Sequence, residues 1–238
     1  MSASLHDETV GGVAEEAAEA LSPPPEGRTA AQEEVLAAAA RAFMERGFAA
    51  TSIDDVAAVM GATKGRVYHY YRSKLALFHD VTRRSLEVIH GEVAAAAEGG
   101  SPTARMTRML RAHVNSILRD QPFHRAAMQG VELHLLPAAS AEQKEAVRDL
   151  IALRGAHERL FAGVLTEGIA AGEFRPCDVA TTIRTLLPAL NGPVFWYRPR
   201  AQETEADRSR IIDEVVAFAL AGLGSRPDKA TKTEETTA

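Results

Sequence analysis

A short stretch of the sequence, from Thr63 to Lys74, concentrates side chains that could bind nucleic acid. It reads TKGRVYHYYRSK, with three tyrosines, one histidine, four lysines or arginines and no acid. Cationic side chains bind phosphates, and polar and aromatic side chains reach sugars and base edges. The segment from Gly61 to Arg84 carries a local charge of +5, the strongest positive patch of the chain. A solvated helix face would show the same cluster, so these residues must first be placed on structural elements.

The bulk composition favours a helical protein and excludes several other classes. Of the 238 residues, 46% are hydrophobic but only 5% are aromatic, and alanine is abundant, a mixture that suits helices better than strands. Cys177 is the single cysteine, so an intrachain disulfide is impossible. We find neither an apolar run long enough to cross a bilayer nor a secretory leader. We therefore expect a soluble, cytoplasmic protein without a membrane partner.

The formal net charge of −5 does not exclude DNA as a partner, because the charge is unevenly distributed. Residues 1–27 hold six acidic side chains and no lysine or arginine, which leaves +1 for the rest of the chain. These residues end in a run of prolines, and we predict that 1–27 form a disordered acidic tail. Residues 224–238 are rich in Thr, Lys and Glu, and we predict a second disordered tail there.

Capping signals predict three helices between about Thr29 and Tyr71. Thr29 with Gln32 forms a capping box, and Gly47 is a left-handed stop. Ser52 with Asp55 opens a short second helix that ends at Gly61. A third short helix starts near Thr63, and Ser73 caps the helix that follows. Two short helices joined by a glycine-containing turn are typical of a helix-turn-helix unit, which we assign to residues 28–74.

Longer helical patterns fill residues 75–223. We expect helices near 102–119 and 122–136, a long helix opened by Ser140 and closed by Gly172, a helix near 178–196 bent or broken by Pro188 and Pro193, and a last helix near 205–222. The predicted fold is all-α: a three-helix helix-turn-helix DNA-binding domain followed by a larger helical domain for ligand binding and dimerisation.

A recognition helix needs a slim, hydrogen-bonding side that fits the major groove. Gly65 presents no side chain, so the backbone can approach DNA closely, and we expect Lys64, Gly65 and Tyr68 to face the bases. Phosphate contacts are expected from Thr63, His69 and Lys74. Three residues are open to two interpretations. Arg28 could contact a phosphate or be a solvated cation, and Thr51 could contact a phosphate or be structural. For Ser52 we favour a helix cap over a DNA contact. Tyr71 and Phe78 are expected in the core.

The segment GFAATSIDDVAAVMGATKGRVYHYYRSKLALF resembles the DNA-binding domain of the TetR family of bacterial transcriptional repressors. The matching features are the entry threonine Thr51, Lys64-Gly65 at the start of the recognition helix, Tyr68, the pair Tyr70-Tyr71, and Ser73-Lys74. The resemblance implies a homodimeric repressor of roughly nine helices that binds a palindromic double-stranded operator. We expect the dimer seam near 178–196 and 205–222, with Ile212, Val216 and Leu220 shared between chains.

The C-terminal half is similar, more loosely, to a branch of TetR-type repressors that respond to CoA thioesters. Gly168, Gly172, Phe174 and Arg175 match one motif, and Trp196 to Pro199 match another; Gly192 and Phe195 stand where that branch often has tryptophan and arginine. The implied effector is a small hydrophobic molecule, an acyl-CoA being one possibility. The candidate effector-binding residues, each also compatible with an ordinary core or surface position, are Met109, His113, His134, Phe161, Phe174, Trp196 and Arg198.

Two other classes compete with this interpretation. An all-helical enzyme would need a catalytic motif, yet the chain has no HExxH, GxSxG, Walker loop or CxxC, and Glu87 with His90 forms the only E-x-x-H. We therefore expect no catalytic residues, metal or cofactor. A helical scaffold without DNA binding would leave the basic segment at Thr63–Lys74 unexplained. The operator, the target genes, the effector and the sign of regulation are not readable from the sequence.

Overall fold

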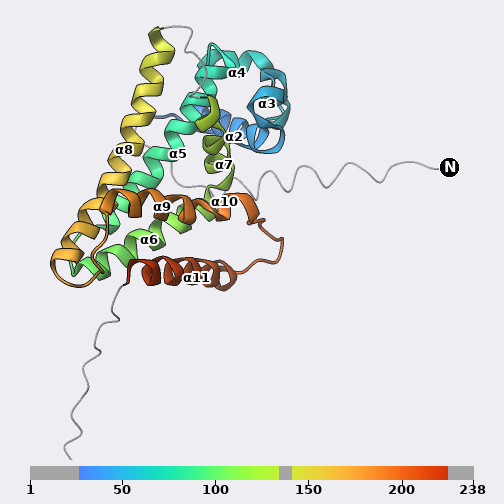
Figure 1. Cartoon of the computed structure of the whole chain (residues 1–238). Helices are drawn as coiled ribbons and strands as arrows, with labels where there is room; N and C mark the ends of the chain where they lie inside the picture. The colour runs from blue at the N-terminus through green and yellow to red at the C-terminus, as the bar shows by residue number, and fades with distance from the viewer. Residues whose placement is uncertain (1–26, 134–140, 225–238) are drawn as a thin grey trace, which may run out of the picture.

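The computed structural model describes residues 27–133 and 141–224, and the chain is helical throughout these ranges, without a β-strand (Figure 1). The small N-terminal group comprises α2 (Ala30–Ala50), α3 (Ile53–Val59) and α4 (Lys64–Tyr70). The larger group comprises α5 (Lys74–Ala96), α6 (Pro102–Arg119), α7 (Gln121–Leu133), α8 (Ala141–Ala170), α9 (Val179–Asn191), α10 (Pro193–Trp196) and α11 (Glu205–Leu223). The all-α prediction is confirmed. Except for Gly27 and Gly224, both predicted tails lie outside the described residues, as does Ser140.

The predicted caps set the geometry of the N-terminal group. Thr29 and Gln32 form a complete capping box on α2, and Ser52 and Asp55 form one on α3. Gly47 has φ 80°, as expected for a glycine stop, but the chain resumes a further helical turn to Ala50. Gly61 has φ 62° and ends the turn that follows α3. These local signals are strong because each satisfies backbone groups that helix ends leave unpaired.

An apolar cluster holds α2, α3 and α4 against the start of α5. Phe43 and Phe78 meet edge to face, with ring centroids 5.3 Å apart, and Val67 anchors α4 in the same cluster. Tyr71 is buried and donates its hydroxyl to Asp80 at 2.6 Å. The predicted core positions of Tyr71 and Phe78 are therefore confirmed, and α4 is left with its other side free.

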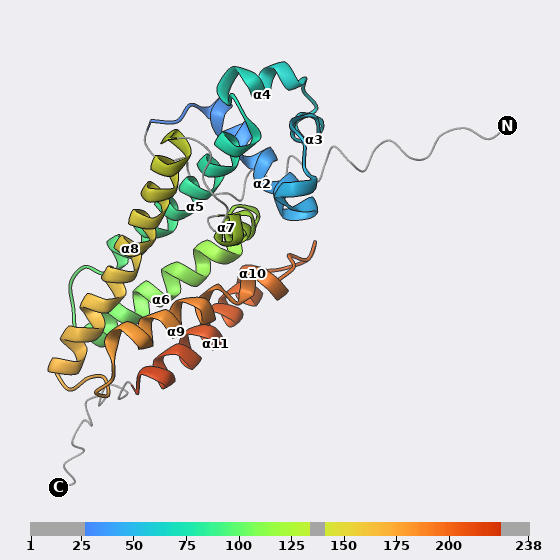
Figure 2. The same cartoon turned by 45° about the horizontal axis from the view of Figure 1, so that its top comes forward.

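The larger group builds its own core around α6. Figures 1 and 2 show α8 running along α5, and α9 and α11 lying side by side next to α6. Pro188 lies inside α9 without ending it, whereas Pro193 opens the short α10. Of the two prolines, only Pro193 therefore marks a helix boundary. Among the described helices, none combines the length and apolarity that crossing a bilayer requires.

The predicted seam residues of α11 need a correction. Ile212 and Val216 are buried inside the protomer, in the core formed with α6 and α9, and Leu220 is partly buried against that core. Ile212 and Val216 therefore have little surface left for contact with a second chain, whereas Leu220 keeps part of its surface. The large apolar side chains that do face solvent nearby are Phe195, Trp196 and Phe218.

A close approach between α8 and the loop after it depends on Gly168. A Cβ built at this position would lie 2.1 Å from the Phe174 ring and 3.1 Å from Pro102. The ring is buried in the core. Gly163, on the exposed side of the same helix, has open space around it.

We predict opposite effects for alanine at these two glycines. Gly168→Ala should destabilise the protein by about 1–3 kcal/mol, because overpacking outweighs the gain in helix propensity. Gly163→Ala should instead be stabilising by up to about 1 kcal/mol. Urea unfolding of both variants checks this, and equal stabilities would contradict the packing described for Phe174.

Candidate nucleic-acid interface and ligand cavity

The recognition segment places five of the predicted DNA contacts on one free surface. Thr63, Lys64, Gly65, Tyr68 and His69 are all exposed on α4 or at its start. The Tyr68 side chain is 50% exposed, so packing inside the protein does not account for a large aromatic residue at this position. Lys64 approaches only Asp54, at 3.9 Å, and both side chains are largely exposed, so this pair is weak. The surface is free to meet a partner.

Three of the remaining predicted contacts are used inside the fold. The Lys74 ammonium donates to the carbonyls of Phe48 at 2.8 Å, Ala49 at 3.2 Å and Thr51 at 2.8 Å. The buried Thr51 hydroxyl donates to the carbonyl of Gly47 at 2.7 Å. Together they fix the joint between α2 and α3. Ser52 caps α3, as the cap interpretation expected.

Arg28 is neither solvated nor free. Its guanidinium pairs with Asp80 at 2.7 Å and with Glu87 at 2.9 Å, and only 12% of its side chain is exposed. These carboxylates raise the pKa of Arg28 against the opposing effect of burial. The residue therefore ties the start of α2 to α5, and a phosphate would have to compete with two carboxylates for it.

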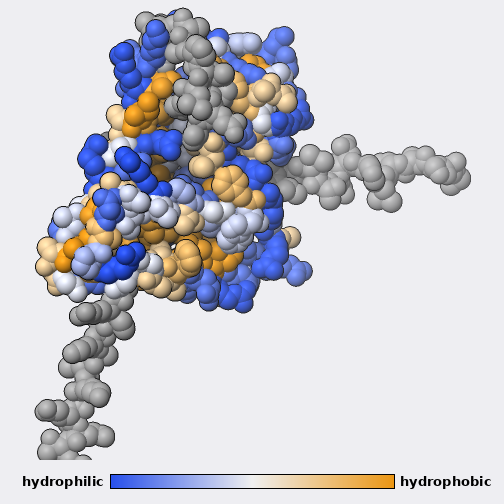
Figure 3. All heavy atoms as spheres, viewed as in Figure 1, coloured by the Kyte–Doolittle hydropathy of each residue, from blue (hydrophilic) through white to orange (hydrophobic). Residues whose placement is uncertain are grey.

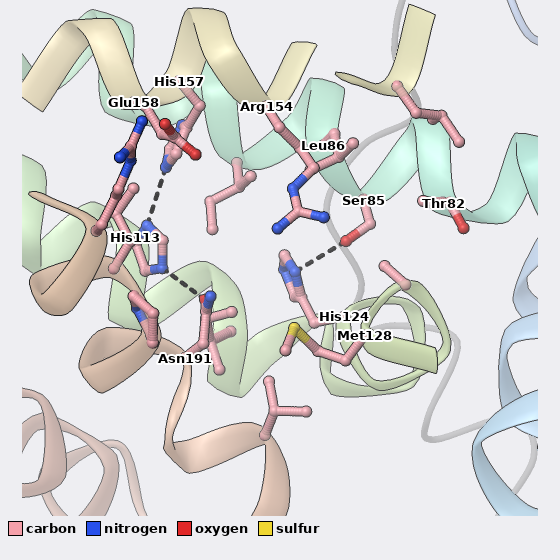
Figure 4. Close-up of a pocket in the computed structure, with 18 residues that line it drawn as sticks. Thr82, Ser85, Leu86, His113, His124, Met128, Arg154, His157, Glu158 and Asn191 are labelled. Carbon is pink, nitrogen blue, oxygen red and sulfur yellow. Dashed lines mark hydrogen bonds between the residues drawn. The ribbon is translucent and has the colours of Figure 1, made fainter. Parts of the chain in front are cut away.

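A cavity of about 340 Å³ opens in the larger group, between α5, α6, α7, α8 and α9 (Figure 4). Its size is that of small-molecule sites. Much of the wall is apolar, formed by Leu86, Ile89, Ile117, Ala127, Met128, Leu150, Leu187, Pro188 and Val194. The polar lining consists of Thr82, Ser85, His113, His124, Arg154, His157, Glu158, Arg184 and Asn191.

Hydrogen bonds fix three buried histidines in this lining. His113 lies between His157, at 3.1 Å from Nδ1 to Nε2, and Asn191, at 3.0 Å from Nε2 to Oδ1. On the other side of the cavity, His124 Nδ1 lies 2.8 Å from the Ser85 hydroxyl (Figure 4). Burial lowers the pKa of His113 to about 4 and the pKa of His124 and His157 to about 3. All three are neutral at pH 7.

The neutral state of these rings determines the direction of the hydrogen bonds. A neutral imidazole has one donor and one acceptor nitrogen. With the Asn191 oxygen facing it, His113 donates from Nε2 and accepts at Nδ1 the proton of His157 Nε2. The Nδ1 of His157 is then an acceptor, and it is buried without a hydrogen-bond partner.

Of the predicted effector residues that the structure describes, His113 alone lines this cavity. Met109 and Phe161 are buried in the core, and Phe161 packs edge-on against His113. Phe174 packs against Gly168, and Trp196 is exposed on the outer side of α10. Arg198 is exposed and donates to the carbonyls of Phe195 and Tyr197. His134 lies outside the described residues.

Sequence reasoning missed His124, Arg154 and His157. They come from α7 and α8, and only packing brings them to one space. A histidine in an otherwise apolar helix was the available signal, and it selected His113. No comparable signal marks Arg154, because an arginine in a long helix is usually solvated.

One helix, α7, contacts both the cavity and the N-terminal group. His124 and Met128 line the cavity from one of its sides. From another side, the Gln129 amide donates to the carbonyl of Phe43 at 2.9 Å and accepts the backbone N–H of Phe48 at 3.0 Å. These two bonds bracket the kink of α2 at Gly47. Movement of α7 would therefore reach both the cavity and the helix-turn-helix unit.

An apolar groove runs along the face formed by α9, α10 and α11. Figure 3 shows hydrophobic residues gathered over this part of the surface. The groove is lined by Ala189, Pro193, Trp196, Ile211, Val215 and Phe218, with Arg210 and Glu214 at its edge. Within the part of the chain that the structure describes, no cluster of His, Cys, Asp or Glu could hold a metal ion.

Comparison with known proteins gives matches along most of the chain. The family model "Bacterial regulatory proteins, tetR family" matches residues 35–81, and "Tetracyclin repressor-like, C-terminal domain" matches residues 99–223. The HTH-type transcriptional repressor KstR2 of Rhodococcus jostii is 28% identical over 211 residues, which cover 86% of this chain and 98% of the relative.

Solved structures show the same arrangement of helices. The TetR family regulator PfmR from Thermus thermophilus has a TM-score of 0.68 at 27% identity, over 81% of this chain and 98% of its own. AibR, solved in complex with isovaleryl coenzyme A and operator DNA, has a TM-score of 0.64 at 18% identity, over 79% of this chain and 97% of its own. At 18% identity, the likeness to AibR shows a shared fold alone.

The three neutral histidines predict a loss of stability in mild acid. Each takes up a proton in the unfolded chain below about pH 6.5, but stays neutral in the folded chain down to about pH 4 or 3. The free energy of unfolding should therefore fall as the pH drops below about 6.5, by up to about 1.4 kcal/mol per pH unit for each histidine. Urea unfolding between about pH 7 and about pH 5 measures the slope. In His124→Gln the slope should be shallower by one histidine's share, and an unchanged slope would contradict a neutral buried His124.

Proposed function

The chain belongs to the TetR family of bacterial regulatory proteins, and we propose that it acts as a homodimer on a palindromic operator and is released from it by a small hydrophobic effector. The family membership supports a transcriptional repressor over an enzyme or a scaffold. The observation that carries the DNA-binding part is the free surface of α4, where Thr63, Lys64, Gly65, Tyr68 and His69 are exposed together.

The glycine in this surface has no explanation inside the protein. Gly65 lies in the helix with ordinary backbone angles, and an added Cβ would meet only the Thr63 hydroxyl, at 3.7 Å. A helical glycine costs about 1 kcal/mol relative to alanine. A partner that approaches the backbone closely, as the floor of the major groove does, gives the position a reason to lack a side chain.

We predict that Lys64→Ala and Tyr68→Ala each weaken operator binding while leaving thermal stability almost unchanged. A lost base contact should cost about 1–3 kcal/mol of binding free energy, and a lost phosphate contact should give a smaller, sequence-independent loss with a shallower salt dependence. Gel shifts at several salt concentrations measure both effects, with the exposed Lys144→Ala of α8 as the control. Wild-type affinity in the Lys64→Ala/Tyr68→Ala double variant would rule out α4 as the recognition helix.

The homodimer is proposed to form through the groove of α9, α10 and α11. Phe218 is 72% exposed and Trp196 is 57% exposed, a cost in water that a second copy would remove. Two copies joined here would form a four-helix bundle from α9 and α11 and would present two recognition helices to the two halves of a palindrome. The proposed seam uses the same helices that the sequence predicted, but its contacts come from the groove residues and not from the inward-facing Ile212 and Val216.

We predict that Phe218→Glu converts the dimer to a monomer at micromolar concentration. A carboxylate at the seam would lose its hydration on association without gaining a partner. Light scattering measures the mass, and Ile151→Glu is the matched control, because Ile151 is also an exposed apolar residue but lies on α8. A wild-type protein that is monomeric would overturn the seam itself.

The effector is proposed to enter the cavity bounded by α5 to α9. Its apolar wall and the adaptable Met128 suit a hydrophobic molecule. An acyl-CoA is the first candidate, supported by the resemblance to CoA-responsive repressors and by isovaleryl coenzyme A in the AibR structure; a free lipophilic compound is the second. A ligand that favours a dimer with a different spacing of α4 would lower operator affinity by its differential affinity for the two states.

A titration of the operator complex separates the two candidates. Release by long-chain acyl-CoAs alone would support the first, and equal release by the matched free acids would support the second. CoA without an acyl chain is the control. If a broad lipophilic panel neither releases DNA nor raises the melting temperature, the hydrophobic effector is wrong.

A further inference from the structure

Two arginines, Arg154 and Arg184, line the cavity. Arg154 of α8 and Arg184 of α9 form no ion pair with any residue in the described ranges. Glu158 is the one carboxylate of the described lining, and it lies beyond salt-bridge distance of both. Figure 4 shows the Arg154 side chain descending from α8 toward the side of the cavity where His124 lies.

The histidines of the lining cannot neutralise the charge of Arg154. His113, His124 and His157 carry no charge at pH 7, as their lowered pKa values show. His113 is engaged with His157 and Asn191, and His124 with Ser85. The pKa of Asp178 is lowered by its hydrogen bonds with Thr181 and by the charge of Arg184, so Arg184 has a nearby carboxylate. Arg154 is then the cation of the described lining that can receive an anionic ligand.

An apolar wall lies beside this positive group. Ile117, Leu150 and Val194 are buried residues from three different helices, and all line the cavity. Arg154 itself keeps access to solvent, so it lies where the cavity opens. A guanidinium presents a planar fork of donors that matches carboxylate, sulfonate and phosphate oxygens. The two features together select a ligand with an apolar body and one anionic head.

We propose that the cavity binds an amphipathic anion, with its head on Arg154 and its body against the wall formed by Ile117, Leu150 and Val194. The proposal rests on the cavity being the effector site and adds the chemical class of the effector. A neutral lipid or alcohol of equal size would form no charge-assisted hydrogen bond with Arg154 and would bind more weakly.

A matched pair of fluorescent probes tests this without DNA. Anilinonaphthalene sulfonate and phenylnaphthylamine share one aromatic body and differ by the sulfonate. The wild-type protein should bind the sulfonate probe at least roughly tenfold more tightly than the neutral probe, since a charge-assisted hydrogen bond is worth that much. In Arg154→Gln the preference should disappear through loss of sulfonate binding, with the affinity for the neutral probe unchanged.

Two further variants locate the binding. Arg159→Gln removes an exposed arginine of the same helix that does not line the cavity, and it should keep the full preference. Ala127→Phe fills the cavity and should abolish binding of both probes while circular dichroism shows an intact fold. Decanoate and decyl phosphate, but not decanol, should displace the sulfonate probe, and their relative affinities distinguish a carboxylate from a phosphate effector.

The proposal is overturned if wild type and Arg154→Gln show the same preference, or if the probes still bind to folded Ala127→Phe. Failure of operator binding would leave it standing, because every measurement here is made on the free protein. Conversely, an operator complex that responds to neutral lipids alone would retain the proposed repressor function and remove the anionic effector.

Discussion

The buried cation Arg84 is the constraint on which the joining of the two helical groups depends. Its side chain is fully buried, and an unpaired charge at such a place costs several kcal/mol. The chain meets this cost by bringing Glu33 of α2 and Asp120, at the end of α6, to the guanidinium and by stacking it on Phe123 of α7, 3.9 Å from the ring centroid. Because these partners come from both groups, the cation fixes the helix-turn-helix unit to the larger group.

The position of Phe123 makes this junction relevant to regulation. Phe123 and His124 are neighbours on α7, and the first packs on Arg84 while the second lines the cavity. Gln129, less than two turns on, holds the backbone around the α2 kink. A ligand that shifts α7 thus has to rearrange contacts at Arg84 and at Gly47 together. Coupling between sites requires such an element with two arrangements, and α7 is the helix that both sites share.

The sequence predicted what depends on local signals and missed what depends on packing between distant helices. Caps at Thr29 and Ser52 and the glycine stop at Gly61 are interactions within a few residues, so the helix-turn-helix unit could be placed almost to the residue. An apolar stripe shows which side of a helix is buried, but not against what. The stripe of α11 therefore looked like a dimer seam, although Ile212 and Val216 are buried in the protomer's own core. For the same reason, core residues such as Met109 could not be told from cavity-lining residues such as Ile117.

The departure from the CoA-responsive pattern at Gly192 and Phe195 has a structural counterpart. Gly192 joins α9 to α10, and a Cβ there would approach the Ala189 carbonyl oxygen to 3.0 Å, so a larger side chain would force this joint to shift. Phe195 is 57% exposed and takes no part in the cavity lining. Neither position therefore sends a polar group into the cavity, and its cations come from α8 and α9 instead. The charged lining of the cavity is thus set by α8 and α9, within a fold that the chain shares with its family.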